Sequence, residues 1–252
     1  MKQILKYSVV RFALPVCLAG AVAIQIASSQ EPAAPQAKEA KGQGQVKGKA
    51  RVIPEDNRPP LFLRETFKEP PTGATEAPMT QEFLANPNLE VKLYGPGGKE
   101  VNVVHHASPK DEPTYIWSGV ATGTWALTLR DKANYVDLSS PVAKIKWRTK
   151  MAGFHLLRPV IKLADGTMLV GDYTEQYASD WHESEFALAD VRWRGLDPEH
   201  AVEATDGRWR PTPDLTKVDE IGFTDLSAGT GHGAGGSARV DYIEVYGVPV
   251  KR

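Results

Sequence analysis

The stretch from Gly171 to Glu185 is the densest group of residues in the chain whose types could do chemistry. Aromatic rings alternate there with charged and titratable groups, namely Asp172, Tyr173, Tyr177, Asp180, Trp181, His182, Glu183 and Glu185. Flat rings stack on the apolar faces of sugar rings, and fixed planar polar groups hydrogen-bond sugar hydroxyls. Long polar loops in compact domains are more often functional than idle, so we expect a ligand site with Trp181 as its platform. The alternative is that Trp181 plugs one end of the domain while the acids stay solvated.

Arg158 is the second candidate, because it interrupts a largely apolar run between Leu157 and Pro159. A charge in such a place must be paired or must face a cleft. Pro159 suits an edge strand or a bulge, which favours an arginine at the floor of a concave sheet, with His155 beside it. The alternative is a buried ion pair with an acid such as Asp172.

Histidines offer a weaker case for a metal site. His105 and His106 are adjacent, and neighbouring residues of a strand point to opposite faces, so they cannot bind one ion together without a bulge. His232 lies in the glycine-rich loop 229–236, where it is free to approach a ligand. It is equally explained as an ordinary loop residue.

Catalytic signatures are sparse. A glycosidase needs two carboxylates across the scissile bond, and Asp180 and Glu183, with His182 between them, could supply an acid and a base. No G-x-S-x-G or H-E-x-x-H motif is present. The glycine-rich loop precedes a strand rather than a helix, which argues against a phosphate-binding loop.

Short strands separated by turn residues predict an all-β sandwich. Residues 143–150 alternate, so Lys144, Lys146 and Arg148 should face solvent while Ile145 and Trp147 face inward. Asp165-Gly166 predicts a tight hairpin, and residues 197–201 suggest one helical turn. The expected strands are 89–94, 101–105, 115–120, 125–130, 135–138, 143–150, 156–163, 168–170, 185–188, 191–194, 218–225 and 239–246.

Two segments carry a resemblance to a known fold family. Residues 214–225 and 238–247 read DLTKVDEIGFTD and ARVDYIEVYG, and residues 135–148 lead from YVDLS to AKIKWR. With residues 153–166 they resemble galactose-binding-domain-like jelly rolls, the β-sandwiches of many carbohydrate-binding modules. Strict alternation in the last strand would put Val240, Tyr242, Glu244 and Tyr246 on one face.

The resemblance implies a jelly-roll fold, a carbohydrate ligand and a structural calcium. Many such modules hold calcium through backbone carbonyls and an acid on the last strand, where Asp241 stands in this chain. Hard oxygen ligands are those that calcium prefers. The alternative for Asp241 is an ordinary ion pair with a lysine or arginine.

The N-terminal region has the composition of an exported protein. Residues 1–29 resemble a signal peptide, with a basic start and an apolar stretch too short to span a membrane comfortably. The alternative is an uncleaved anchor. Residues 30–60 form a linker poor in apolar residues, and 61–252 form one β-sandwich domain. Cys17 is the only cysteine, so cleavage would leave no disulfide.

Charge further restricts the function. The formal net charge is −1, and removing the three basic residues of 1–29 leaves −4, which argues against nucleic acid as a partner. We expect a secreted or periplasmic, non-catalytic carbohydrate-binding protein with no integral membrane span after signal cleavage. Two alternatives stay open: a glycoside hydrolase or lyase that uses Asp180, Glu183 and His182, and a structural envelope protein with an envelope protein as its partner.

Overall fold

The computed structural model describes residues 58–210, 212–227 and 236–252. The expected signal peptide, residues 30–57 of the expected linker and His232 lie outside these ranges. Within them the chain is built from strands and three short 3-10 turns, η2 (Gln81–Phe83), η3 (Gly98–Glu100) and η4 (Leu188–Asp190). No helix in this part of the chain is long and apolar enough to cross a membrane.

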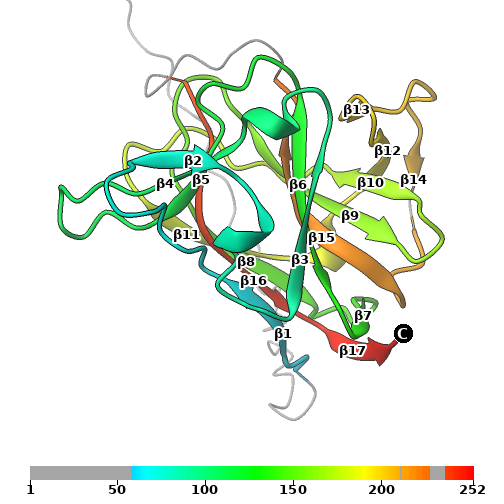
Figure 1. The fold of residues 1–252 in the computed structure, drawn as a ribbon. Helices are drawn as coiled ribbons and strands as arrows, with labels where there is room; N and C mark the ends of the chain where they lie inside the picture. Colours follow the sequence, from blue (N-terminus) through cyan, green and yellow to red (C-terminus); the bar gives the residue numbers. More distant parts are fainter. Residues whose placement is uncertain (1–57, 211, 228–235) are drawn as a thin grey trace, which may run out of the picture. The chain divides into compact units, whose positions relative to one another are not determined.

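The strands form two antiparallel sheets (Figure 1). The seven-stranded sheet has the order β11-β8-β16-β5-β4-β2, with β1 paired to β16. It contains β1 (Leu61–Glu65), β2 (Glu76–Pro78), β4 (Asn102–Val104), β5 (Tyr115–Trp117), β8 (Lys144–Thr149), β11 (His182–Ala187) and β16 (Arg239–Tyr246).

The ten-stranded sheet has the order β13-β12-β10-β9-β15-β6-β3. In addition, β14 pairs with β12, and β7 pairs with β15 and β17. The sheet contains β3 (Leu89–Tyr94), β6 (Trp125–Asp131), β7 (Asn134–Asp137), β9 (Leu157–Leu163), β10 (Met168–Gly171), β12 (Trp193–Asp197), β13 (Val202–Glu203), β14 (Trp209–Arg210), β15 (Val218–Asp225) and β17 (Val248–Lys251).

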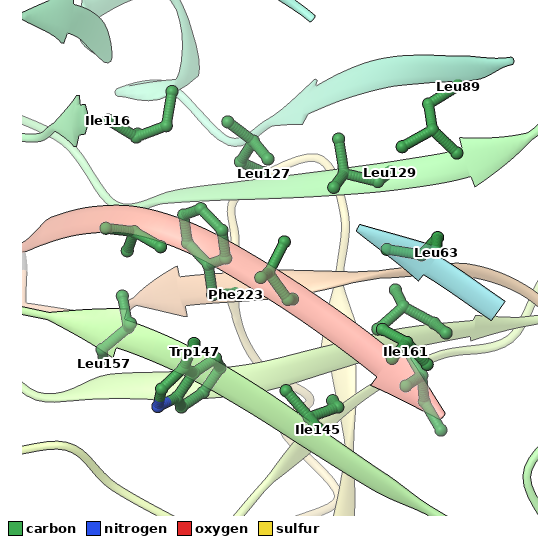
Figure 2. Close-up of a cluster of buried hydrophobic side chains, with 14 of the residues drawn as sticks. Leu63, Leu89, Ile116, Leu127, Leu129, Ile145, Trp147, Leu157, Ile161 and Phe223 are labelled. Atoms are coloured by element: carbon green, nitrogen blue, oxygen red, sulfur yellow. The ribbon is translucent and has the colours of Figure 1, made fainter. Parts of the chain in front are cut away.

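The core lies between the inner faces of the two sheets. Leu127, Leu129 and Phe223 come from the ten-stranded sheet. Ile145 and Trp147 come from the seven-stranded sheet and point into the same interior (Figure 2). Burying one such side chain contributes about 1.5–3 kcal/mol, so this apolar layer is the main stabilising feature. The two antiparallel layers confirm the expected all-β class and jelly-roll sandwich.

Two local predictions from the sequence are confirmed, the alternation along β8 and the hairpin between β9 and β10. Ile145 and Trp147 are fully buried, whereas Lys144, Lys146 and Arg148 lie on the outer face of β8. β9 and β10 form the hairpin expected at Asp165-Gly166. Gly166 has a φ of +90°, a conformation that an L side chain would resist.

Strict alternation along β16 is wrong. Val240 pairs with Thr149 and Tyr242 with Arg148, so Asp241 is an extra residue in a bulge. The bulge changes the phase of the strand. Val240 is therefore buried in the core with Ile243 and Val245, while Tyr242, Glu244 and Tyr246 face outward with the basic residues of β8.

Residues 197–201 are not a helical turn either. They close a hairpin between β12 and β13, in which Leu196 pairs with Glu203 and Asp197 with Val202. Ala201 has a φ of +48°, which allows the chain to reverse. Local composition suggested a turn of helix, but the cross-strand pairs convert the same residues into a hairpin.

The β12–β13 hairpin covers part of the outer face of the ten-stranded sheet. Its turn reaches segments next to β3 and β6, because Gly95 N donates to the Pro198 carbonyl at 3.2 Å and Thr124 Oγ1 donates to the His200 carbonyl at 2.5 Å. Leu196, on β12 of this hairpin, joins a second apolar cluster with Ala126, Val160, Met168 and Val170. Apolar side chains therefore line part of the outer face of this sheet, and the turn of the β12–β13 hairpin covers part of it.

Candidate ligand-binding face

The residues predicted from the loop 171–185 separate onto different faces. His182, Glu183 and Glu185 lie on β11, where successive side chains alternate. His182 Nε2 points inward to Glu175 Oε2 at 2.8 Å. Glu183 points outward, 2.8 Å from Lys146 Nζ, and accepts a hydrogen bond from Tyr242 Oη at 2.5 Å. The structure therefore does not bring His182 and Glu183 into one cleft.

Glu175, which sequence reasoning missed, is the inner end of this group. It is buried and accepts hydrogen bonds from Trp147 Nε1 at 3.0 Å and Tyr173 Oη at 2.6 Å. Burial raises the pKa of Glu175, but hydrogen bonds from Trp147, Tyr173 and His182 together outweigh it and lower the pKa. Tyr173 also stacks on Phe186 with ring centroids 3.8 Å apart. Tyr173 is thus part of the core packing.

Trp181 and Asp180 lie on the side of the seven-stranded sheet. The Trp181 ring lies 5.3 Å from the ring of Tyr115, and the Arg148 guanidinium is 5.5 Å from its centroid. Trp181 Nε1 is buried without a hydrogen-bond partner among the described residues. Asp180 is exposed, and its nearest cation is Lys150 at 3.8 Å. Trp181 is therefore packed against neighbours, and Asp180 stands in solvent.

Asp241 forms an ion pair. Its Oδ2 lies 2.8 Å from Arg148 Nη1, and burial raises its pKa despite this partner. Within the described ranges no three histidine, cysteine, aspartate or glutamate side chains group together as metal ligands. The positive charge of Arg148 beside Asp241 would repel a calcium ion bound at the same carboxylate. The described residues thus fit an ion pair better than a metal site, and calcium stays a prediction from the resemblance.

His155 is an internal residue. It is buried, and its Nδ1 contacts Asp225 Oδ2, while Asp225 Oδ1 accepts from Ser227 N at 2.9 Å. Asp225 lies at the end of β15, opposite Leu157. His155 is therefore held at the end of the sandwich and does not line the outer face on which Arg158 lies.

Arg158 lies on the outer face of the ten-stranded sheet, on a central strand rather than the expected edge or bulge. In the register that pairs Val160 with Val170, Pro159 stands opposite Gly171. Proline has no N–H to donate across this pair, and the Gly171 carbonyl instead accepts from Arg158 Nε at 2.7 Å. The arginine thus supplies the donor that Pro159 lacks, which is why a central strand tolerates this proline.

Glu203 joins Arg158 to the next part of the face. Its Oε1 accepts from Arg158 Nη1 at 2.6 Å, and its Oε2 accepts from Arg194 Nη1 at 2.6 Å. Burial raises the pKa of Glu203, but the two guanidinium groups outweigh it and hold the pKa below its usual range. The acid that pairs with Arg158 is therefore Glu203 and not Asp172.

Asp172 holds a second arginine. Its Oδ1 accepts from the backbone N–H of Arg192 at 2.8 Å and its Oδ2 from Arg192 Nε at 2.7 Å. Burial raises the pKa of Asp172, and Arg192 more than reverses this. The ring of Trp209 on β14 lies 4.5 Å from the guanidinium carbon of Arg192 and 4.0 Å from that of Arg194. Both arginines are thereby fixed next to an indole ring.

These residues form one network, which we call the Trp209 cluster: Arg158, Asp172, Arg192, Arg194, Glu203 and Trp209. Arg158 and Asp172 were expected from the sequence. Arg192, Arg194, Glu203 and Trp209 were missed, although arginines two positions apart in a short strand are a signal for a charged face. They lie on β9, β12, β13 and β14 and in the segments that follow β10 and precede β12, so local pattern does not reveal their contacts.

A second polar group lies on the same face. Glu220 is buried and accepts from Thr128 Oγ1 at 2.5 Å and from Tyr94 Oη at 2.8 Å. Lys162 Nζ lies 3.1 Å from Glu220 Oε1 and 5.5 Å from the centre of the Tyr94 ring. The polar atoms of this second group therefore hydrogen-bond to one another, and the group stabilises the outer face.

Comparison with known proteins finds matches among solved structures only. No protein-family model and no curated protein matches the chain. Among solved structures, the chain is similar to a family 11 carbohydrate-binding module from Clostridium thermocellum in complex with a β-1,3-1,4-mixed-linked tetrasaccharide. The identity is 18%, the TM-score 0.36, and the match covers 75% of this chain and 99% of that one.

Two enzymes also match over part of their length. An exo-β-agarase is 8% identical with a TM-score of 0.39, and the match covers 71% of this chain and 25% of the enzyme. An arabinose-bound α-L-arabinofuranosidase is 14% identical with a TM-score of 0.34, covering 74% of this chain and 26% of the enzyme. At these TM-scores the matches carry no argument about the site, and the fold rests on the sandwich itself.

Proposed function

We propose that the protein binds carbohydrate without cleaving it, at the Trp209 cluster on the outer face of the ten-stranded sheet. One observation carries this proposal: an indole ring is fixed beside two guanidinium groups that carboxylates hold in position. Sugar sites combine an aromatic surface with a few oriented polar groups. Because Asp172 and Glu203 already order the arginines, these side chains would lose little conformational entropy when a ligand binds. The composition of residues 1–29 supports action outside the cytoplasm.

A binding role agrees better with the acids of this face than a catalytic role does. A glycosidase needs one carboxylic acid that stays protonated near neutral pH. Asp172 and Glu203 instead have lowered pKa values because arginines hold them. On β11, Glu183 is bound by Lys146 and Tyr242, and its pKa is also lowered. These carboxylates are suited to fixing cations in place.

An exposed apolar patch favours a protein partner as a second candidate function. Phe154 is 95% exposed and Tyr177 is 67% exposed, and Leu156 is also exposed. The two segments that carry them are neighbours, because Leu157 and Glu175 form a β-bridge. Contiguous patches of exposed apolar side chains are a typical mark of protein interaction sites. An envelope protein would be the partner that the sequence suggests.

A polysaccharide panel tests the proposed function. The full chain is run by affinity electrophoresis through gels that contain each polysaccharide, and the same samples are assayed for new reducing ends. We expect retardation by at least one polymer with no release of reducing ends. Retardation by none would reject carbohydrate binding and favour the protein-partner candidate, and new reducing ends would favour the enzyme. A parallel gel with EDTA tests calcium, because a calcium-dependent fold would lose its retardation.

A further inference from the structure

The arginines of the Trp209 cluster have more hydrogen-bond donors than the cluster uses. Arg192 donates from its backbone N–H and its Nε to Asp172, and its side chain is 67% exposed. The outer N–H groups of this guanidinium are therefore open to solvent, next to the indole of Trp209. A guanidinium in this position offers a fixed, planar pair of donors.

The carboxylates of the cluster, by contrast, are both paired with arginines. Each oxygen of Glu203 accepts from a different arginine, and each oxygen of Asp172 accepts from Arg192. Arg194 Nε is buried and has no hydrogen-bond partner in the described part of the chain. Three arginines face two carboxylates, so one positive charge is left over. The face therefore offers donors and positive charge but no free carboxylate.

A neutral sugar does not match this balance. Its hydroxyls donate as well as accept, so a site for a neutral sugar uses acceptors as fully as donors. A carboxylate or sulfate group only accepts, and it pairs with a guanidinium through two parallel hydrogen bonds. A pyranose ring that carries such a group could lie against Trp209 while the group meets Arg192. Partial desolvation beside the indole would strengthen this contact.

We infer that the carbohydrate bound at the Trp209 cluster is acidic, a polysaccharide that carries uronate carboxylates or sulfate esters. This inference rests on the proposed carbohydrate-binding function and specifies its ligand class. Arg192 is the specificity-determining residue, since its free N–H groups are the ones that would meet the anion. The leftover charge would add attraction that weakens as salt rises.

The test compares acidic polymers with their neutral counterparts. Binding of the full chain is measured to polygalacturonate and to carboxyl-reduced polygalacturonate, and to a sulfated galactan and its desulfated form. We expect one acidic polymer to bind about tenfold or more tightly than its neutral form, a difference of about 1.4 kcal/mol. Which acidic polymer binds distinguishes a uronate from a sulfate ligand. Equal binding of both members of each pair would overturn the inference and leave carbohydrate binding intact.

Matched arginine variants separate the site from general charge attraction. Arg192→Gln should remove the preference for the acidic polymer, and Arg192→Lys should restore only part of it because lysine lacks the planar fork. Arg64→Gln is the control, since Arg64 is 53% exposed and paired with Glu244 on the other sheet. Circular dichroism verifies that each variant is folded. If Arg192→Gln and Arg64→Gln lost the preference for the acidic polymer equally, the inference would be contradicted. Binding to no polymer at all would overturn it together with the proposed function.

Discussion

At the scale of single residues, Glu203 is the group on which the site geometry depends. It lies on a two-residue strand, β13, yet it holds Arg158 of β9 and Arg194 of β12 at 2.6 Å each. Without this carboxylate the two like charges would repel each other, and Arg194 would be free to leave Trp209. The position of one acid therefore decides whether the arginines form an ordered face.

Glu203→Gln should lower stability in a pH-dependent way. The pKa of Glu203 is lower in the folded chain, so the carboxylate contributes stability that is complete above its unfolded pKa of about 4.3 and is lost as pH falls through the folded value. We expect the variant to cost about 1 kcal/mol near pH 7 and progressively less below pH ~4. Urea unfolding of both proteins across this range measures it, and a difference that does not change with pH would contradict the assigned role.

Side-chain direction was predictable where one strand alternates and unpredictable where strands meet. Lys146 and Trp147 were placed correctly on opposite faces of β8 because neighbours in a strand alternate. For Arg158 the sequence favoured a cleft over an ion pair, and the structure shows an ion pair. Its partner, Glu203, is distant in the sequence and was not identified. Long-range partners depend on which strands are neighbours in the sheet, and periodicity carries no such information.

At the scale of elements, the β12–β13 hairpin links the Trp209 cluster to the rest of the sheet. Its turn was mistaken for helix because Asp-Pro-Glu-His composition says little about pairing across strands. The bulge at Asp241 was missed for a similar reason. One extra residue in β16 moves Val240 into the core, and only its partners on β8 reveal the shift.

Leu196→Ala should loosen this hairpin. Leu196 is buried in the second apolar cluster, and truncating such a side chain costs about 2–5 kcal/mol. The hairpin turn should then leave the sheet more often, which would free the Gly95 amide that donates to Pro198. Hydrogen exchange of Gly95 should speed up more than exchange in the centre of β15. Unchanged exchange at Gly95 would mean that the hairpin is held by other contacts.

Gly222 of β15 and Gly166 of the β9–β10 turn should respond differently to alanine. A Cβ at Gly222 would lie 1.9 Å from the Leu127 carbonyl oxygen, so Gly222→Ala should cost about 3 kcal/mol or more because two backbones must separate. Gly166 has open space around it but a φ of +90°, so Gly166→Ala should cost only about 1–2 kcal/mol. Thermal or urea unfolding ranks the two variants, and the reverse order would contradict the strand packing described.

At the scale of the whole described domain, Trp181 and Trp209, two of the chain's six tryptophans, lie beside different sheets. Composition, turns and alternation were enough to predict an all-β sandwich. They favoured Trp181, because it lies among many polar residues in the sequence. In the structure those residues diverge, and Trp209 gains the fixed arginines and acids instead. The position of the proposed site depends on the packing of strands that are far apart in the chain.

The most direct test of the account is polysaccharide binding by Trp209→Ala and Trp181→Ala, compared with the wild-type chain. Both changes remove an indole ring. Unfolding curves of the variants distinguish a loss of binding from a loss of the folded structure. We predict that Trp209→Ala weakens binding by about tenfold or more, about 1.4 kcal/mol, while Trp181→Ala binds as the wild type does. Binding that survives in Trp209→Ala and is lost in Trp181→Ala would contradict the account and move the site to the seven-stranded sheet.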